Sequence, residues 1–172
     1  MIKNKEKIER LKKGIKLIVL DVDGTLTDGK IYMGNNGELF KAFDIKDGCG
    51  IHDILPQYGI IPVIITARKS DIVMNRCEEL NITECYQGVR NKLEKMREVA
   101  DKYGLSCNEK DIYEEIAYVG DDIIDIDCMQ HCGITACPNN AVKKVKEISD
   151  FVSEFNGGEG AVREFIEFIT DC

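Results

Sequence analysis

The feature that most constrains this chain is a repeated alternation of short apolar runs with longer stretches of helical pattern. The apolar runs are too short for typical helices and are rich in β-branched residues, which is typical of buried parallel strands. We expect such strands at residues 15–20, 61–65, 84–87, 116–119 and 133–137. Helical patterns occur near residues 3–13, 69–80, 90–104, 122–131 and 140–148. Right-handed crossovers assemble such units into a parallel sheet with helices on both faces, so the sequence predicts an α/β fold with a doubly wound sheet.

One insertion interrupts this alternation between the first two predicted strands. Two strand-like runs flank an Asn-Asn-Gly turn, which predicts a β-hairpin over about residues 30–43. An isolated hairpin is only marginally stable in water, so its apolar side chains should pack against something. Another subunit and the sheet of the same chain are the two alternatives.

Charge and hydropathy exclude several classes of partner. The chain has 23 Lys and Arg against 31 Asp and Glu, a net charge of −8, which argues against binding to nucleic acids or anionic membranes. No apolar run approaches the roughly 20 residues that span a bilayer, and the first residues lack the apolar core of a signal peptide. We therefore expect a cytoplasmic protein. Since no repeat or linker divides the 172 residues, residues 1–172 are expected to form one domain.

The eight cysteines are irregularly spaced and include no C-x-x-C pair. The densest group, Cys128, His131, Cys132 and Cys137, has the soft ligands of a metal site. The alternative is that these cysteines belong to the core, because Cys128 and Cys132 share one helix face and Cys137 ends an apolar run. The second interpretation fits the spacing better.

Polar residues with catalytic potential follow several of the predicted strands. The segment Asp21-Val22-Asp23-Gly24-Thr25 follows the first strand, Thr66 ends the second, and Gly120-Asp121-Asp122 follows the fourth. Lys92 opens the helix after the third strand. Ligands of an open parallel sheet bind beyond the carboxyl ends of its strands, so we expect these groups to converge.

The predicted cluster has the chemistry of a phosphate site. Several carboxylates in one place repel one another unless a cation is present, and carboxylate oxygens without His or Cys suit Mg²⁺. An ammonium group and a hydroxyl are suitable partners for phosphate oxygens. Asp21 is then the natural nucleophile, and Asp23 is placed to donate a proton and later accept one. Each motif alone also suits a polar turn or a helix N-cap, but their joint occurrence in this order favours a site.

The four motifs resemble those of the haloacid dehalogenase superfamily. The stretches LDVDGTLTDGKIYMGNNGE, KAFDIKDGCGI, IITARK, YQGVRNKL, YVGDDIID and GGEGAVREF are similar, more narrowly, to the 3-deoxy-D-manno-octulosonate 8-phosphate phosphatases. The resemblance implies a Rossmann-like domain without a large cap, a Mg²⁺ ion and a homotetramer in which the hairpins pack together. The implied substrate is a small phosphorylated sugar acid.

The resemblance also assigns roles to residues of this chain. It implies a metal site made of the Asp21 carboxylate, the Asp23 backbone carbonyl and Asp121, and a catalytic set of Asp21, Asp23, Thr66 and Lys92. The implied substrate-binding residues are Asp23, Asp44, Ile45, Lys46, Asp47, Gly48, His52, Arg68, Arg76 and Lys92.

This chain departs from the family pattern at three positions. His52 and Lys46 stand where these phosphatases commonly have Arg, and Ala67 replaces the Gly of their Thr-Gly-Arg. Phosphatases for nine-carbon ulosonate 9-phosphates differ at such pocket positions and are one alternative. A catalytically silent oligomerisation module is another, although every expected catalytic residue is present.

The end of the chain is expected to be a flexible tail over about residues 157–172. The Gly157-Gly158-Glu159-Gly160 segment is typical of a hinge, and a helical pattern follows at 161–169. The resemblance implies that this tail helps to close the site of a neighbouring subunit. Arg163 is then either aimed at the substrate or a surface charge.

Overall fold

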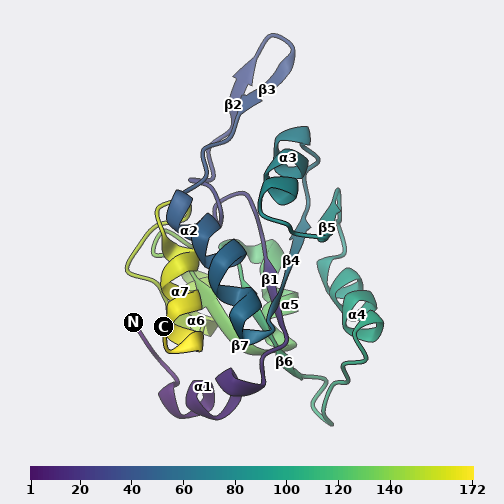
Figure 1. Ribbon diagram of the computed structural model, residues 1–172, viewed down its shortest axis with the longest axis vertical. Helices are drawn as coiled ribbons and strands as arrows, with labels where there is room; N and C mark the ends of the chain where they lie inside the picture. The colour runs from purple at the N-terminus through teal and green to yellow at the C-terminus, as the bar shows by residue number, and fades with distance from the viewer.

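A six-stranded parallel sheet forms the centre of the computed structural model, which describes residues 1–172 (Figure 1). In chain order its strands are β1 (Leu17–Leu20), β4 (Ile61–Thr66), β5 (Glu84–Gln87), β6 (Tyr113–Val119), β7 (Cys132–Cys137) and β8 (Phe151–Val152). In space the order is β5-β4-β1-β6-β7-β8, with every neighbouring pair parallel. The chain therefore builds outward from β1 in one direction and then crosses back to build in the other.

Helices cover both faces of the sheet, as the apolar runs predict. One face packs against α1 (Lys5–Leu11), α3 (Asp71–Glu79), α7 (Ala161–Thr170) and the turns that follow α2 (Ile45–Cys49). The other packs against α4 (Lys92–Lys102), α5 (Ile126–Gln130) and α6 (Lys143–Ile148). Each face of the sheet has its own hydrophobic core, and successive residues of β1 alternate between them. Ile18 and Leu20 pack in the core of the first face, and Leu17 and Val19 pack in the core of the second. The α/β, doubly wound fold without a large cap is confirmed.

The structure differs locally from the sequence prediction in three short elements. Strand β8 was not expected, because Phe151–Val152 is too short to show a periodicity. The stretch predicted as one helix at 122–131 begins with a 3-10 turn, Ile123–Asp125, before α5. A π-helical turn, Gly50–Ile54, extends α2.

The predicted hairpin consists of β2 (Tyr32–Gly34) and β3 (Gly37–Phe40) and projects from the body of the molecule (Figure 1). Gly37 has φ +115° at the turn, a conformation that favours glycine. Met33 and Leu39 are 62% and 63% exposed, and Tyr32 stacks on Phe40 with ring centroids 4.3 Å apart. The outer part of the hairpin therefore does not fold down on its own sheet, and its apolar face is left uncovered in the single chain.

The expectation of a flexible C-terminal tail is wrong for this structure. Helix α7 is packed in the core, where Val162, Phe165 and Ile166 have no exposed surface. The glycines before it serve close packing: a Cβ on Gly157 would lie 1.8 Å from the carbonyl oxygen of Gly24. Sequence reasoning took glycine as a sign of flexibility, whereas here it permits two backbone segments to touch.

The cysteine group at 128–137 belongs to the core, but the predicted shared helix face is wrong, because α5 ends at Gln130 and Cys132 begins β7. Cys128, Cys132 and Cys137 are buried, and the Cys132 thiol lies 3.3 Å from the sulfur of Met96. His131 instead contacts the Asp111 carbonyl oxygen through Nδ1, at 2.7 Å. No thiol belongs to a cluster able to hold a metal ion.

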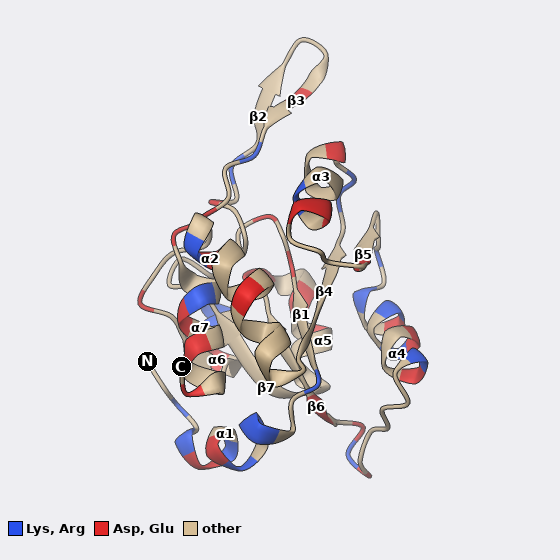
Figure 2. Cartoon of the chain, in the orientation of Figure 1, with Lys and Arg blue, Asp and Glu red and all other residues tan.

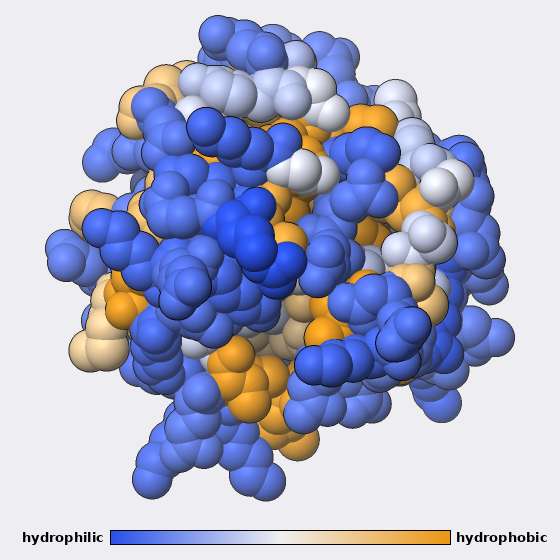
Figure 3. Space-filling model, turned by 90° about the horizontal axis from the view of Figure 1, so that it is seen from below, coloured by the Kyte–Doolittle hydropathy of each residue, from blue (hydrophilic) through white to orange (hydrophobic).

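The surface away from the hairpin is hydrophilic and mixed in charge. Lys and Arg alternate with Asp and Glu along α1 and α4 (Figure 2). Seen from the end opposite the hairpin, apolar residues form only small groups between hydrophilic ones (Figure 3). The longest helix has 11 residues, and none of the helices could cross a lipid bilayer.

Candidate functional site

The predicted motifs meet where the chain reverses its direction across the sheet. Strands β1 and β6 are neighbours, and the backbone N–H of Asp21 donates to the Val119 carbonyl at 3.0 Å. Asp21 therefore leaves β1 beside the Gly120–Asp122 segment that leaves β6. This is the point of an open sheet at which a crevice forms beyond the strand ends.

The turn after β1 is shaped by close contacts. Gly24 has φ +95°, and a Cβ there would lie 2.1 Å from Oδ2 of Asp121. The backbone N–H groups of Thr25, Leu26 and Thr27 all lie within 3.2 Å of the Val22 carbonyl oxygen. Glycine is thus required at position 24 both for its φ and because the Asp121 carboxylate occupies the space of a side chain.

Lys92 joins the ends of three strands. It is the first residue of α4, whose N-cap Asn91 accepts a hydrogen bond from the Glu94 N–H. Its ammonium group lies 2.7 Å from Oδ1 of Asp21 and 2.7 Å from Oδ1 of Asp125. Although burial opposes its charge, these two carboxylates raise the pKa of Lys92 above its ordinary value.

Asp125 is a buried carboxylate of this site that the sequence reasoning missed. Its side chain is fully buried and accepts four hydrogen bonds. Two come from Lys92 and the Tyr118 hydroxyl at 2.7 and 2.8 Å, and two from the backbone N–H groups of Asp121 and Asp122 at 3.1 and 3.2 Å. The signal was present in the spacing Asp122-x-x-Asp125, which forms a capping box at the start of the helical segment.

The buried carboxylates at this site carry more negative charge than their surroundings compensate. Burial, and then the charge of Asp125, raise the pKa of Asp21 to about 6. Burial, followed by the charges of Asp21 and Asp125, raises the pKa of Asp121 to about 7. Three carboxylates share one ammonium group, Lys92, so the site would carry a charge near −2 with all three ionised, and this repulsion contributes to the raised pKa values of Asp21 and Asp121.

These residues fit a divalent cation with oxygen ligands. Carboxylate oxygens of Asp21, Asp121 and Asp125 lie within 4.8 Å of one another. The four donors around Asp125 occupy its lone pairs, so this residue holds the site together rather than offering a ligand. Asp21 and Asp121 remain available, since Lys92 reaches only one oxygen of Asp21 and Thr25 lies 3.5 Å from one oxygen of Asp121. A hard cation such as Mg²⁺ suits this donor set.

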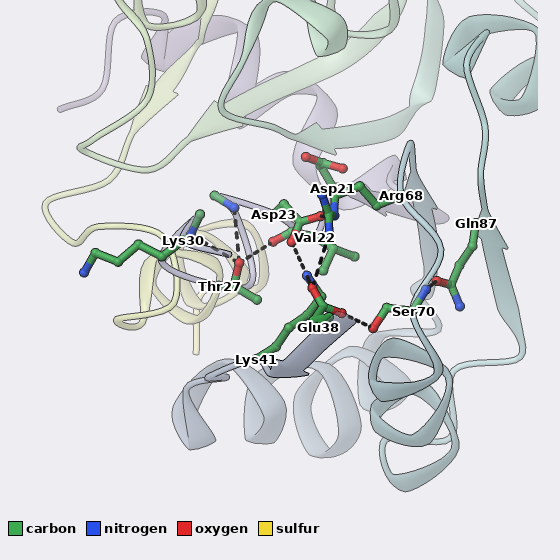
Figure 4. Close-up of polar contacts among 12 residues, drawn as sticks. Asp21, Val22, Asp23, Thr27, Lys30, Glu38, Lys41, Arg68, Ser70 and Gln87 are labelled. Atoms are coloured by element: carbon green, nitrogen blue, oxygen red, sulfur yellow. Dashed lines mark hydrogen bonds and ion pairs between the residues drawn. The ribbon is translucent and has the colours of Figure 1, made fainter. Parts of the chain in front are cut away.

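The other two predicted catalytic residues line the same end of the sheet. Thr66 ends β4 and is 2% exposed, and its carbonyl accepts the Val89 N–H at 3.0 Å. Asp23 follows Asp21 by two residues and is more accessible, with 20% of its side chain exposed. Arg68 lies two residues beyond Thr66, with Nε 3.6 Å from Oδ2 of Asp23 (Figure 4). The structure thus brings Asp21, Asp23 and Lys92 to neighbouring strand ends.

The predicted substrate-binding residues fall into separate groups. Ile45, Gly48, His52 and Arg76 line one open groove of about 370 Å³ between α2 and α3. A Cβ on Gly48 would lie 2.3 Å from Nη2 of Arg76, so the glycine makes room for the guanidinium. None of these four residues is hydrogen-bonded or ion-paired with the Asp21, Lys92 and Asp121 cluster.

Asp44, Lys46 and Asp47 make contacts outside the groove between α2 and α3. The carboxylate of Asp44 caps α2 by accepting the N–H of Lys46 at 2.6 Å. Asp47 is 2% exposed and accepts the N–H of Arg163 at 2.7 Å, at the first turn of α7. Lys46 lines a second pocket with Arg163, whose Nε pairs with Glu167 at 2.7 Å. Arg163 therefore lies at the α7 side of α2, not at the carboxylate cluster.

Comparison with known proteins agrees with this geometry. Residues 77–166 match the family model of haloacid dehalogenase-like hydrolases. The 3-deoxy-D-manno-octulosonate 8-phosphate phosphatase of Escherichia coli K12 is 43% identical over 155 residues, which are 90% of this chain and 79% of that protein. The chain belongs to this phosphatase family of the haloacid dehalogenase superfamily.

Solved structures of the haloacid dehalogenase superfamily share the whole fold. The phosphatase of the same name from Moraxella catarrhalis, in complex with magnesium ion, phosphate ion and KDO, has a TM-score of 0.89 and 36% identity, covering 97% of this chain and 92% of that one. The one from Yersinia pestis has a TM-score of 0.87 and 35% identity, covering 95% and 85%. The likeness therefore includes both the hairpin region and α7.

Proposed function

We propose that this protein is a Mg²⁺-dependent phosphatase that hydrolyses a ulosonate phosphate, with 3-deoxy-D-manno-octulosonate 8-phosphate as the substrate. The observation that carries the proposal is the buried group of Asp21, Lys92 and Asp121 at the junction of β1 and β6. Membership of the phosphatase family and the bound ligands of the Moraxella protein support it. A silent oligomerisation module would not need this group of buried charges.

Asp21 is the proposed nucleophile. Lys92 contacts only Oδ1 of its carboxylate, so Oδ2 is free to attack phosphorus while a second lone pair of Oδ1 serves as the proposed metal ligand. Attack forms a bond from an Asp21 oxygen to phosphorus and breaks the ester bond, giving an aspartyl-phosphate and the sugar alcohol. Asp23, on the turn beyond, gives a proton to the leaving oxygen and afterwards takes one from the attacking water.

Lys92, Thr66 and the metal site complete the proposed catalytic group. The Lys92 ammonium and the Thr66 hydroxyl are suited to phosphoryl oxygens, and the first also neutralises part of the carboxylate charge. The proposed ligands of Mg²⁺ are the Asp21 and Asp121 carboxylates with the backbone carbonyl of Asp23. When bound, the ion would offset the charge of the carboxylates and of the phosphoryl group.

The sugar acid is proposed to extend from the carboxylate cluster toward the groove between α2 and α3. Arg68 begins this path beside Asp23, and Arg76 and His52 line the groove. Guanidinium groups bind carboxylates through two parallel hydrogen bonds, so both arginines suit the acid group of the substrate. His52 stands where the usual residue is Arg, and phosphatases of nine-carbon ulosonate 9-phosphates differ at such pocket positions. These 9-phosphates are therefore the alternative substrates.

The deciding experiment measures phosphate release by the purified protein with Mg²⁺. The substrates are 3-deoxy-D-manno-octulosonate 8-phosphate, a nine-carbon ulosonate 9-phosphate and common hexose phosphates. The proposal expects the highest kcat/KM on the eight-carbon substrate. A preference for the nine-carbon substrate would change the substrate assignment, and no turnover of any phosphate ester would overturn the proposed activity.

We also propose that the chain forms a homotetramer through its hairpin and works in the cytoplasm. The uncovered apolar side chains Met33, Leu39 and Phe40 support association, because exposed apolar surface of this kind marks interaction sites. All eight cysteines are free thiols, which is typical of a reducing compartment. Sedimentation or light scattering of the Leu39→Lys variant tests the first point, with dissociation as the expected result.

A further inference from the structure

Strand β3 and the residue that follows it make a set of charged contacts that the proposed reaction does not yet use. Lys41 directly follows β3, and its side chain is only 2% exposed. Its ammonium group is ion-paired with Oδ1 of Asp23 and lies 2.9 Å from Oε1 of Glu38 (Figure 4). Although burial opposes the charge, the hydrogen bonds and charges of Asp23 and Glu38 raise the pKa of Lys41 above its ordinary value. We call Glu38 and Lys41 the hairpin stem.

The hairpin stem is fastened to the ends of two strands. Oε2 of Glu38 accepts the Ser70 hydroxyl at 2.6 Å, and the Ser70 N–H donates to the Gln87 side chain at 2.7 Å. Arg68 approaches Oε1 of Glu38 at 3.6 Å. These contacts connect the stem to the segment after β4 and to the end of β5 (Figure 4). Glu38 lies beside the turn of the hairpin, so these contacts join the projecting strand β3 to the ends of β4 and β5.

The direction of the Asp23 carboxyl group depends on these side chains. Lys41 pairs with one of its oxygens and Arg68 approaches the other, whereas no backbone N–H donates to either. A carboxyl group on a turn beyond a strand end can rotate about two side-chain bonds. An error of about 1 Å in the place of a reacting group can reduce a rate by about 10²-fold, so an acid and base at this position needs external support.

We propose that Lys41, anchored by Glu38, is a positioning residue that holds the Asp23 carboxyl group at the reaction site. The hairpin stem then forms a wall of the active site from within the same chain, in a domain that has no large cap. This inference rests on the proposed phosphatase function and adds two residues to it. Lys41 acts through Asp23 in this arrangement, and its own contacts are with carboxylates.

The test compares Lys41→Met with Lys30→Met in the intact protein. Lys30 lies two residues before β2, its side chain is 73% exposed, and its only ion pair is with Asp28, so it controls for the loss of one positive charge. Both variants and the unmodified protein are assayed with Mg²⁺ and p-nitrophenyl phosphate, a small ester that does not fill a sugar site. Lys41→Met is expected to lower kcat about tenfold with KM within about twofold, because positioning acts on the chemical step. Lys30→Met is expected to change neither constant.

Three further measurements separate positioning from a structural defect. Lys41→Arg, which keeps the charge, should recover most of the lost kcat. Glu38→Gln, which still accepts the Ser70 hydroxyl, should lower kcat in the same direction if Lys41→Met does not fold. In the Asp23→Asn background, Lys41→Met should lower kcat by less than about twofold. A residue that acts through Asp23 has no effect on kcat once Asp23 is altered.

The outcomes are distinguishable from failure of the proposed function. If the unmodified protein turned over no phosphate ester, the ulosonate phosphates included, the phosphatase proposal would be overturned and this inference with it. An active protein whose Lys41→Met and Glu38→Gln variants keep their kcat would overturn the inference alone. A rise in KM without loss of kcat would also overturn it, because Lys41 would then bind substrate directly. Equal losses in Lys41→Met and Lys30→Met would show a charge effect in place of positioning.

Discussion

Lys92 and Asp125 form a buried ion pair, with Nζ 2.7 Å from Oδ1 and neither side chain more than 2% exposed. Because three other donors also reach Asp125, this carboxylate has no free lone pair for a ligand. Its role is to hold Lys92 beside Asp21 and to hold the segment that carries Asp121. A residue with no free ligand position can thus control the geometry of the groups that we propose to contact substrate.

We expect Asp125→Ala to reduce both stability and activity. Removing one partner leaves the Lys92 charge buried and the Tyr118 hydroxyl without its acceptor, which should lower the free energy of unfolding by about 3 kcal/mol. The control is Asp122→Ala, which removes an exposed N-cap at a cost of about 1 kcal/mol. Urea unfolding measures both, and similar losses in the two variants would contradict this role for Asp125.

Asp21→Asn should abolish turnover without unfolding the protein. An amide is not a nucleophile toward phosphorus, so we expect kcat to fall by about 10⁴-fold or more. The near-isosteric amide also removes a buried charge, so the melting temperature should stay the same or rise. Phosphate release and circular dichroism measure the two effects. Substantial turnover by clean Asp21→Asn protein would exclude Asp21 as the nucleophile.

Metal dependence should be visible in both activity and stability. EDTA should remove activity, Mg²⁺ should restore it, and Ca²⁺ should inhibit because its looser coordination misaligns the reacting groups. Mg²⁺ should also raise the melting temperature of the unmodified protein. In Asp121→Asn, Mg²⁺ should no longer raise the melting temperature. Without metal and above pH 7, this variant should be more stable than the unmodified protein, because the buried Asp121 charge is unfavourable there. Full activity in EDTA would point to a different mechanism.

Asp47 should make stability depend on pH. Burial raises its pKa to about 6, above the ordinary value, so the folded protein binds this proton more tightly than the unfolded chain. The stability that the protonated form contributes is complete below about pH 4 and is lost as the pH rises through 6. Relative to Asp47→Asn, the unmodified protein should lose on the order of 2 kcal/mol between pH 4 and pH 8. Denaturant unfolding across this range measures the difference in the free energy of unfolding between the two proteins. If Asp47 had an ordinary pKa, this difference would not change between pH 4 and pH 8.

Deleting residues 157–172 should unfold the protein. The deletion removes the core side chains Val162, Phe165 and Ile166, each worth about 2–5 kcal/mol, from a domain whose total stability is about 5–15 kcal/mol. Removing only Asp171 and Cys172, which are exposed, is the matched control and should leave a folded protein. A folded, cooperative protein after the larger deletion would restore the interpretation of this segment as an independent tail.

Sequence reasoning worked best where one local pattern has one structural outcome. The apolar runs before Asp21 and Asp121 are buried on both faces, and such runs specify central parallel strands. It failed for Asp125, because a carboxylate in a capping box is common at helix starts and nothing local shows that Lys92 will reach it. It failed for the glycines before α7 because their purpose is a contact with Gly24, far away in the chain.

The sequence by itself determined the succession of strands and helices along most of the chain, the hairpin, and the polar residues at the strand ends. Periodicity and turn chemistry are local properties, so a local pattern is enough to predict them. Only the tertiary structure decided that Asp125 is saturated with donors while Asp121 is free, that Asp47 faces α7, and that Lys41 meets Asp23. These facts depend on which distant segments share a space and on how many donors each buried carboxylate finds there. Burial and charge balance are properties of the packed chain, and no local pattern contains them.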